Sequence, residues 1–152
     1  MNDVIAPILL VEDDLNDIEL ALAAFDELHL DCEVIVARDG QEALDFLFRE
    51  GRFSLRAGGC PALVLLDVKL PKINGLQVLR QVKSHPLLRR IPVVMLTSSR
   101  EERDLIESYD LGANAYVVKP VGFEDFTRTL HLTCKFWMTI NQRPVEHRIC
   151  SP

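Results

Sequence analysis

Acidic residues end two apolar stretches of the chain and could carry phosphoryl chemistry. Asp67 ends one stretch, and Glu12 and Asp13 end another. A carboxylate held beside a divalent cation can attack phosphorus and form an aspartyl phosphate, so we predict Asp67 as the phosphoacceptor. Magnesium suits such a site because it accepts a few carboxylates and coordinates phosphate oxygens. Its predicted ligands are Glu12, Asp13, Asp67 and the backbone carbonyl of Lys69.

A hydroxyl group and an ammonium group end two further apolar stretches. Thr97 follows residues 91–96, and Lys119 follows residues 115–118. A phosphoryl group in transfer spreads its charge over three oxygens, which Thr97 and Lys119 would share with the metal. The sequence contains no Gly-rich nucleotide loop of the P-loop type. The expected phosphoryl donor is therefore a phosphorylated partner rather than ATP bound by this chain.

Five short apolar segments must position these side chains. They indicate buried strands because they carry no regular polar face, and they are residues 5–11, 33–37, 63–66, 91–96 and 115–118. Because helical patterns alternate with them, we predict a doubly wound α/β fold with a parallel sheet in the order 2-1-3-4-5. This order brings the acids after the first and third strands together, and a like-charge pair at ~4 Å costs about 4 kcal/mol at an effective dielectric of about 20. A cation must relieve that repulsion.

The helices between these strands are predicted from apolar residues at helical spacing. In the first helix, capped by Asp14 or Asn16, the stripe comprises Ile18, Ala21, Leu22, Phe25 and Leu28. The helix in residues 100–111 carries Leu105, Ile106 and Tyr109 on one side and charges on the other, and Gly112 is expected to end it. The last helix is expected from Val121 onward, with a core face of Phe123, Phe126, Leu130, Cys134 and Trp137.

Composition limits the class of protein. The 152 residues fit one domain, and a net charge of −6 argues against general nucleic-acid binding. No apolar run approaches the ~20 residues of a membrane span. The four cysteines Cys32, Cys60, Cys134 and Cys150 form no CxxC pair, and no secretion signal begins the chain. We therefore expect free thiols and a cytoplasmic location.

The sequence resembles the receiver domains of two-component response regulators over about residues 5–136. The motifs that carry the resemblance are Leu10-Val11-Glu12-Asp13, Leu66-Asp67 with Leu70-Pro71 and Gly75, Leu96-Thr97-Ser98, and Tyr116-Val117-Val118-Lys119-Pro120. The resemblance implies a flavodoxin-like (βα)5 fold and phosphorylation of Asp67 by a sensor histidine kinase or a histidine phosphotransfer protein, with Mg²⁺ as cofactor.

The resemblance also assigns roles to the site residues. It makes Asp13 a direct magnesium ligand, with Glu12 acting through water, and assigns Thr97 and Lys119 to the phosphate. It implies that Tyr116 reports the switch by changing rotamer. It further implies a cis peptide bond between Lys119 and Pro120, which a proline makes accessible.

Residues 46–51 with the following loop, and Lys135-Phe136-Trp137, look like the regulators that partner phytochrome-type kinases. We expect a receiver domain in residues 1–140 and a tail in residues 141–152 without an output domain. Signalling would then use the surface of the fourth helix, fifth strand and fifth helix. Leu132, Phe136 and Ile140 recur every four residues off the core stripe. They are candidates for a homodimer or partner contact, unless the tail covers them.

Two alternative functions fit parts of this pattern. A phosphohydrolase of the haloacid dehalogenase type also uses an Asp nucleophile and magnesium, but it needs a second acid two residues later, where this chain has Lys69. A degenerate receiver could act as an interaction module without phosphate, although all five site residues are present. We therefore expect a phosphoacceptor protein rather than an enzyme, with at most slow self-catalysed phosphorylation and dephosphorylation.

Overall fold

The chain folds into a parallel sheet between two layers of helices. The computed structural model describes residues 5–144. The strands are β1 (Ile8–Val11), β2 (Val34–Ala37), β3 (Leu63–Leu66), β4 (Val93–Thr97) and β5 (Ala115–Val118), and they lie in the order β2-β1-β3-β4-β5. The predicted order is confirmed.

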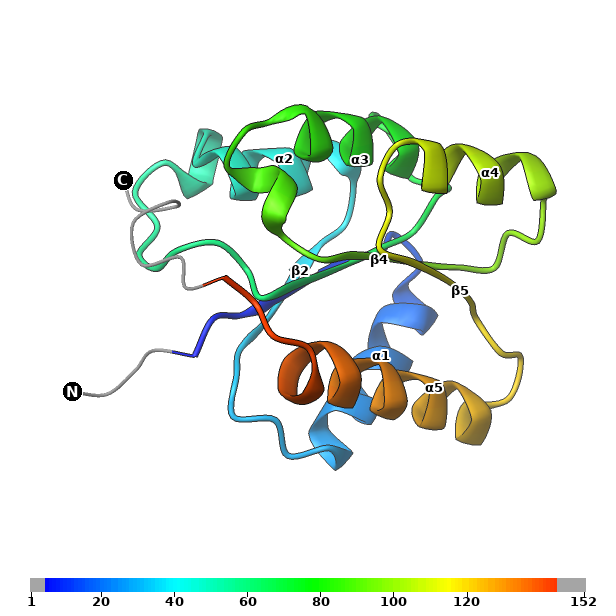
Figure 1. Ribbon diagram of the computed structural model, residues 1–152. Helices are drawn as coiled ribbons and strands as arrows, with labels where there is room; N and C mark the ends of the chain where they lie inside the picture. The colour runs from blue at the N-terminus through cyan, green and yellow to red at the C-terminus, as the bar shows by residue number, and fades with distance from the viewer. Residues whose placement is uncertain (1–4, 145–152) are drawn as a thin grey trace.

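Helices cover both faces of this sheet. The helices are α1 (Leu15–Glu27), α2 (Gly40–Phe48), α3 (Gly75–Ser84), α4 (Glu102–Asp110) and α5 (Phe123–Lys135), and a π-helical turn (Phe136–Ile140) continues α5. Figure 1 shows α2, α3 and α4 on one face and α1 and α5 on the other. Within the described part of the chain, none of the helices is long and apolar enough to span a membrane. Residues 145–152 of the predicted tail lie outside the described residues.

The central strands are apolar on both sides because each side meets a helix layer. Leu9 and Leu66 belong to the core cluster that includes α2 and α3, whereas Leu10 and Leu65 belong to the cluster that includes α1 and α5. Strands β1 and β3 pair in parallel with Val11 opposite Leu66. This register places the residues that follow both strands side by side, which is what the site requires.

Side-chain caps fix where three of the helices begin. Asp14 accepts a hydrogen bond from the backbone N–H of Asp17 at 3.0 Å, so Asp14 rather than Asn16 caps α1. Asp39 caps α2 through the N–H of Glu42 at 2.7 Å. Asn74 begins α3 with a reciprocal capping box. The loops that carry the acidic residues therefore end at defined positions.

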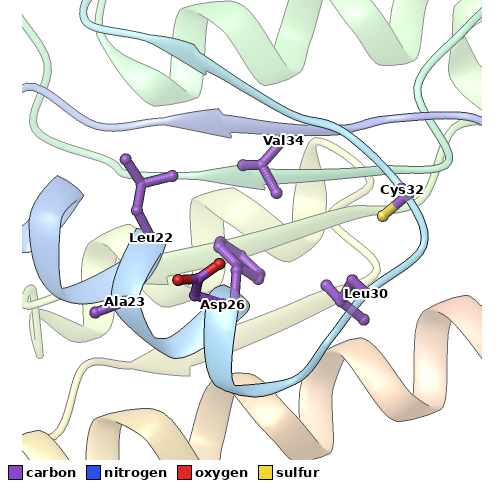
Figure 2. A pocket seen from close by; sticks show the side chains of 7 residues that line it. Leu22, Ala23, Asp26, Leu30, Cys32 and Val34 are labelled. Atoms are coloured by element: carbon purple, nitrogen blue, oxygen red, sulfur yellow. The ribbon is translucent and has the colours of Figure 1, made fainter.

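Some of the predicted core positions are exposed. Leu22 lines a surface pocket of about 450 Å³ beside α1 and β2, together with Leu30 and Cys32 (Figure 2). Phe123 is 42% exposed because α5 begins there, after Gly122, rather than at Val121. The core positions Phe126, Leu130 and Cys134 are confirmed.

Helix α4 turns a polar side inward. Leu105, Ile106 and Tyr109 are exposed, whereas Asp104 and Ser108 are buried. The inward polar groups are satisfied locally, because the Ser108 hydroxyl donates to the Asp104 carbonyl at 2.7 Å and the Ser99 hydroxyl donates to the Asp104 carboxylate at 2.6 Å. The apolar residues of α4 therefore lie at the surface. Gly112 ends the helix as predicted, with a φ of 102°.

The cysteine prediction is only partly correct. Cys32 and Cys134 are free thiols, as expected. Cys60 is disulfide-bonded, so the prediction is wrong at that position. Spacing along the chain does not show which cysteines the fold brings together, and the absence of a CxxC pair was therefore a poor guide. Cys150 lies outside the described residues.

The close contact between α3 and strand β3 leads to a testable prediction. A Cβ atom on Gly75 would lie 1.9 Å from the backbone oxygen of Asp67, whereas a Cβ on Gly122 would meet nothing within 4 Å. We expect Gly75→Ala to lower the free energy of unfolding by at least about 2 kcal/mol, because backbone atoms must move. Gly122→Ala is the control without a backbone clash and should lower it by about 1 kcal/mol or less, because glycine is the better N-cap of α5. Urea denaturation measures both; equal midpoints for the two variants would contradict the packing.

Candidate functional site

A buried lysine joins three carboxylates at the carboxyl edge of the sheet. The Lys119 ammonium donates to Asp67 Oδ2 at 3.1 Å, to Asp17 Oδ2 at 3.0 Å and to Glu12 Oε2. Lys119, Glu12 and Asp67 are each less than a tenth exposed. The ammonium group has three N–H donors, so these carboxylates use all of them.

Burial and charge act in opposite directions on this cluster. Burial raises the pKa of Glu12 to about 7, although the hydrogen bond from Lys119 opposes the change. Burial also disfavours the charged form of Lys119, but Asp67, Glu12 and Asp17 outweigh it and raise the pKa of Lys119. The lysine is therefore a fixed positive charge in a site with an excess of acid.

The acidic residues also form a site that fits a divalent cation. Glu12, Asp13 and Asp67 each offer a carboxylate oxygen, and these oxygens lie within 4.8 Å of one another. Asp67 Oδ1 is buried and has no hydrogen-bond partner within the described residues. Hard carboxylate oxygens around an unpaired buried oxygen are the donor set that Mg²⁺ and similar ions prefer. The cluster therefore fits a divalent metal.

Thr97 lies beside this cluster at the end of β4. It is fully buried, and its backbone carbonyl accepts from the Lys119 N–H at 2.8 Å. Its hydroxyl oxygen accepts a hydrogen bond from the Ser99 N–H at 3.2 Å. Tyr116 donates its hydroxyl to the Ser99 carbonyl at 3.0 Å. The hydroxyls of Thr97 and Tyr116 are thus held by one loop residue, Ser99.

Two site features differ from the sequence-based expectation. The Lys119–Pro120 bond is trans, since the residues described contain no cis peptide bond, and the predicted cis bond is wrong. The trans form is intrinsically preferred by about 0.5–1 kcal/mol even before proline, and here Lys119 reaches its carboxylates with it. Asp17 was not predicted to belong to the site. It occupies the first turn of α1, where an acid has an ordinary explanation in the helix dipole.

The dimer candidates lie away from this cluster, at the end of α5 and in the π-helical turn. Leu132 is 62%, Phe136 44% and Ile140 57% exposed. Exposed apolar side chains mark an interface only where they form a contiguous patch. The three candidates are therefore accessible to a partner, at a distance from the charged edge of the sheet.

Comparison with known proteins places the chain in a family. The model of the response regulator receiver domain matches residues 8–131, and the chain belongs to this family. The protein is a response regulator receiver domain of two-component signalling. Response regulator Rcp1 of Synechocystis sp. is 40% identical over 131 residues, which cover 86% of this chain and 88% of Rcp1.

Solved structures of response regulators share the fold. The phosphorylated cyanobacterial phytochrome response regulator RcpA has a TM-score of 0.86 and 38% identity, covering 92% of this chain and 99% of that chain. The Mn²⁺-bound form of Rcp1 has a TM-score of 0.85 at the same identity and coverage. The bacteriophytochrome response regulator RtBRR is 57% identical, with a TM-score of 0.75, and covers 93% of this chain and 85% of that chain.

If the acidic cluster binds a divalent metal, loss of the Asp13 carboxylate should lower the metal affinity. Asp13→Asn should weaken Mg²⁺ and Mn²⁺ binding by at least about tenfold, because a charged ligand is lost. Asp14→Asn is the matched control. Asp14 is the adjacent acid but lies outside the cluster, and asparagine caps a helix as well as aspartate. Isothermal titration calorimetry measures both variants, and equal affinity in Asp13→Asn and wild type would contradict the assignment.

Proposed function

We propose that Asp67 is the phosphoacceptor of this receiver domain and that Mg²⁺ is its metal. Two observations on Asp67 carry the proposal: its buried Oδ1 has no hydrogen-bond partner within the described residues, and one of its carboxylate oxygens lies within 4.8 Å of oxygens of Glu12 and Asp13. The other carboxylate oxygen of Asp67 is held by Lys119 at 3.1 Å. One oxygen is therefore oriented while the other is available for bond formation.

The proposed reaction transfers a phosphoryl group from a phosphohistidine to Asp67. A carboxylate oxygen of Asp67 forms the new O–P bond, the P–N bond of the donor breaks, and its electron pair returns to the imidazole nitrogen. Lys119 and the hydroxyl of Thr97 would bind the phosphoryl oxygens. When bound, Mg²⁺ supplies charge neutralisation, and it would be held by Glu12 through water, by Asp13 and Asp67, and by the Lys69 carbonyl.

The signal would leave the site through Ser99. To donate its O–H to a phosphoryl oxygen, the Thr97 side chain would move toward the phosphate, which draws its hydroxyl oxygen away from the Ser99 N–H that donates to it. The hydroxyl of Tyr116 bonds the carbonyl of the same residue, which makes a change of Tyr116 rotamer the expected consequence. The surface of α4, β5 and α5 carries these changes outward.

The proposed phosphoryl donor is a sensor histidine kinase or a histidine phosphotransfer protein in the cytoplasm. Exposed apolar residues flank the acidic edge: Leu15 is 57%, Val121 102% and Phe123 42% exposed. Such residues around a charged centre suit a protein donor better than a small molecule. RcpA and RtBRR are described as phytochrome regulators, and we infer a phytochrome-type kinase for this chain.

Neither alternative function gains support. The haloacid dehalogenase mechanism needs an acid where the chain has Lys69, whose ammonium lies 3.6 Å from Glu101. A phosphate-independent module would not need a buried acidic cluster, which destabilises the fold by repulsion. We infer that any turnover is limited to slow self-catalysed phosphorylation and dephosphorylation of Asp67.

Substitution of the acceptor tests this function. Asp67→Asn should abolish labelling, because an amide cannot form the acyl phosphate. Intact-protein mass spectrometry after incubation with a phosphorylated histidine kinase, and separately with acetyl phosphate with and without Mg²⁺, measures one added phosphoryl group. The Asp14→Asn protein should be labelled like wild type. Undiminished labelling of Asp67→Asn, or labelling of wild type at another residue, would refute the assignment.

We also propose a homodimer or partner contact through Leu132, Phe136 and Ile140. These apolar side chains are exposed on the α5 side, and burying them would remove a large apolar surface from water. Within this chain, output is proposed to depend on such surface contacts.

A charge at the centre of this surface tests the dimer. Phe136→Asp should convert a dimer to a monomer and leave the fold intact, because the side chain is 44% exposed. Light scattering coupled to size exclusion gives the mass, and circular dichroism gives the fold. Leu55→Asp is the control, since Leu55 is 96% exposed and lies in the loop before β3. A wild-type protein that is already monomeric would remove the idea.

A further inference from the structure

We propose that Asp17 competes with the phosphoryl group for Lys119 and thereby sets how readily the site captures phosphate. The inference rests on the proposed function of Asp67. It assigns a role to a carboxylate that is not part of the acidic cluster formed by Glu12, Asp13 and Asp67. Asp17 acts through Lys119 and is therefore a positioning residue.

Lys119 has no hydrogen-bond donor to spare. Glu12, Asp17 and Asp67 each accept one hydrogen bond from the ammonium group. An ammonium group has three N–H donors and no more. A phosphoryl oxygen on Asp67 can therefore bind Lys119 only after one of these carboxylates gives up its hydrogen bond.

The three carboxylates differ in how easily each can release its hydrogen bond from Lys119. Glu12 is 3% exposed, and its second oxygen accepts from the N–H groups of Asp13 and Asp14 at 3.1 Å each. Asp67 carries the phosphoryl group itself. The side chain of Asp17 is 34% exposed, so water can replace its hydrogen bond at little free-energy cost. Asp17 is thus the carboxylate that releases its hydrogen bond from Lys119 to the phosphoryl group.

The negative charge of Asp17 also acts on the incoming phosphoryl group. The carboxylate of Asp17 lies 3.0 Å from the ammonium group that must contact the phosphoryl oxygens. An anion so close to this position repels a phosphoryl group, even where solvent screens part of the charge. Asp17 therefore weakens phosphoryl binding twice: it occupies a donor, and its charge opposes the incoming one.

Asp17 also connects α1 to the loop that carries Lys119. The Asp17–Lys119 contact links the first turn of α1 to the loop after β5, across 102 residues of sequence. Without phosphate it holds Lys119 at the site, in a defined position. Once the phosphoryl group has taken the lysine, the start of α1 is no longer tied to that loop.

Substitution by asparagine removes the charge and keeps the size. With saturating Mg²⁺, Asp17→Asn should bind beryllium fluoride, which mimics a phosphoryl group on a carboxylate, about threefold to tenfold more tightly than wild type. The concentration of acetyl phosphate that gives half-maximal labelling of the Asp17→Asn protein should fall by a similar factor. Asp17→Glu keeps the charge and should return both values toward wild type. Fluorine NMR measures beryllium fluoride binding, and mass spectrometry measures labelling.

Control variants separate loss of the Asp17–Lys119 contact from loss of a negative charge in general. Asp14→Asn removes an equal charge from the same helix start without touching Lys119, and should leave both values near wild type. The Mg²⁺ affinity of Asp17→Asn should change much less than that of Asp13→Asn, because Asp17 is outside the acidic cluster. Unchanged or weaker beryllium fluoride binding by Asp17→Asn at saturating Mg²⁺ overturns the proposal. A wild-type protein that is not labelled at Asp67 overturns the proposed function instead.

Discussion

The site depends on the sharing of one buried ammonium group among several carboxylates. Glu12 and Asp67 are almost fully buried, and taking such groups out of water is unfavourable unless a counter-charge and hydrogen bonds accompany them. Lys119 supplies both, yet one positive charge cannot balance all the nearby acids. The remaining negative potential is what makes the edge of the sheet a place for a divalent cation. Structure and metal affinity therefore have the same electrostatic origin.

The sheet fixes the relative positions of these buried carboxylates. The parallel pairing of β1 with β3 fixes where Asp67 lies relative to Glu12 and Asp13. The start of α3 packs against the backbone of Asp67 so closely that only glycine fits at position 75. The backbone of Asp67 is consequently held from two sides, by pairing in the sheet and by packing of a helix start, while Oδ1 of its side chain has no hydrogen-bond partner within the described residues.

The sequence predicted the parts of the site that follow strands. Runs such as residues 63–66 have no polar side, and a charged residue directly after them must lie at the strand end, so Asp67, Glu12 and Lys119 were placed from pattern alone. Asp17 could not be found this way, because the direction of a side chain on a helix turn depends on how that helix docks. Its contact with Lys119 joins segments far apart in the chain.

The inward side of α4 was missed for a different reason. Hydrophobic periodicity assumes that the apolar side of a helix faces the core, but Asp104 and Ser108 satisfy each other and Ser99 with hydrogen bonds and can be buried at low cost. The exposed Phe123 reflects a helix that begins two residues later than the pattern indicated. In both cases local hydrogen bonding or helix capping decided the outcome, and neither leaves a clear periodic signal.

The polar inner side of α4 has a thermodynamic consequence. The heat-capacity change of a transition comes mainly from apolar surface that gains or loses contact with water. Because the buried side of α4 presents Asp104 and Ser108 rather than large apolar side chains, a shift of this helix exposes little such surface. The enthalpy of any such shift should accordingly vary little with temperature, so that temperature alone would favour or oppose the shift only weakly.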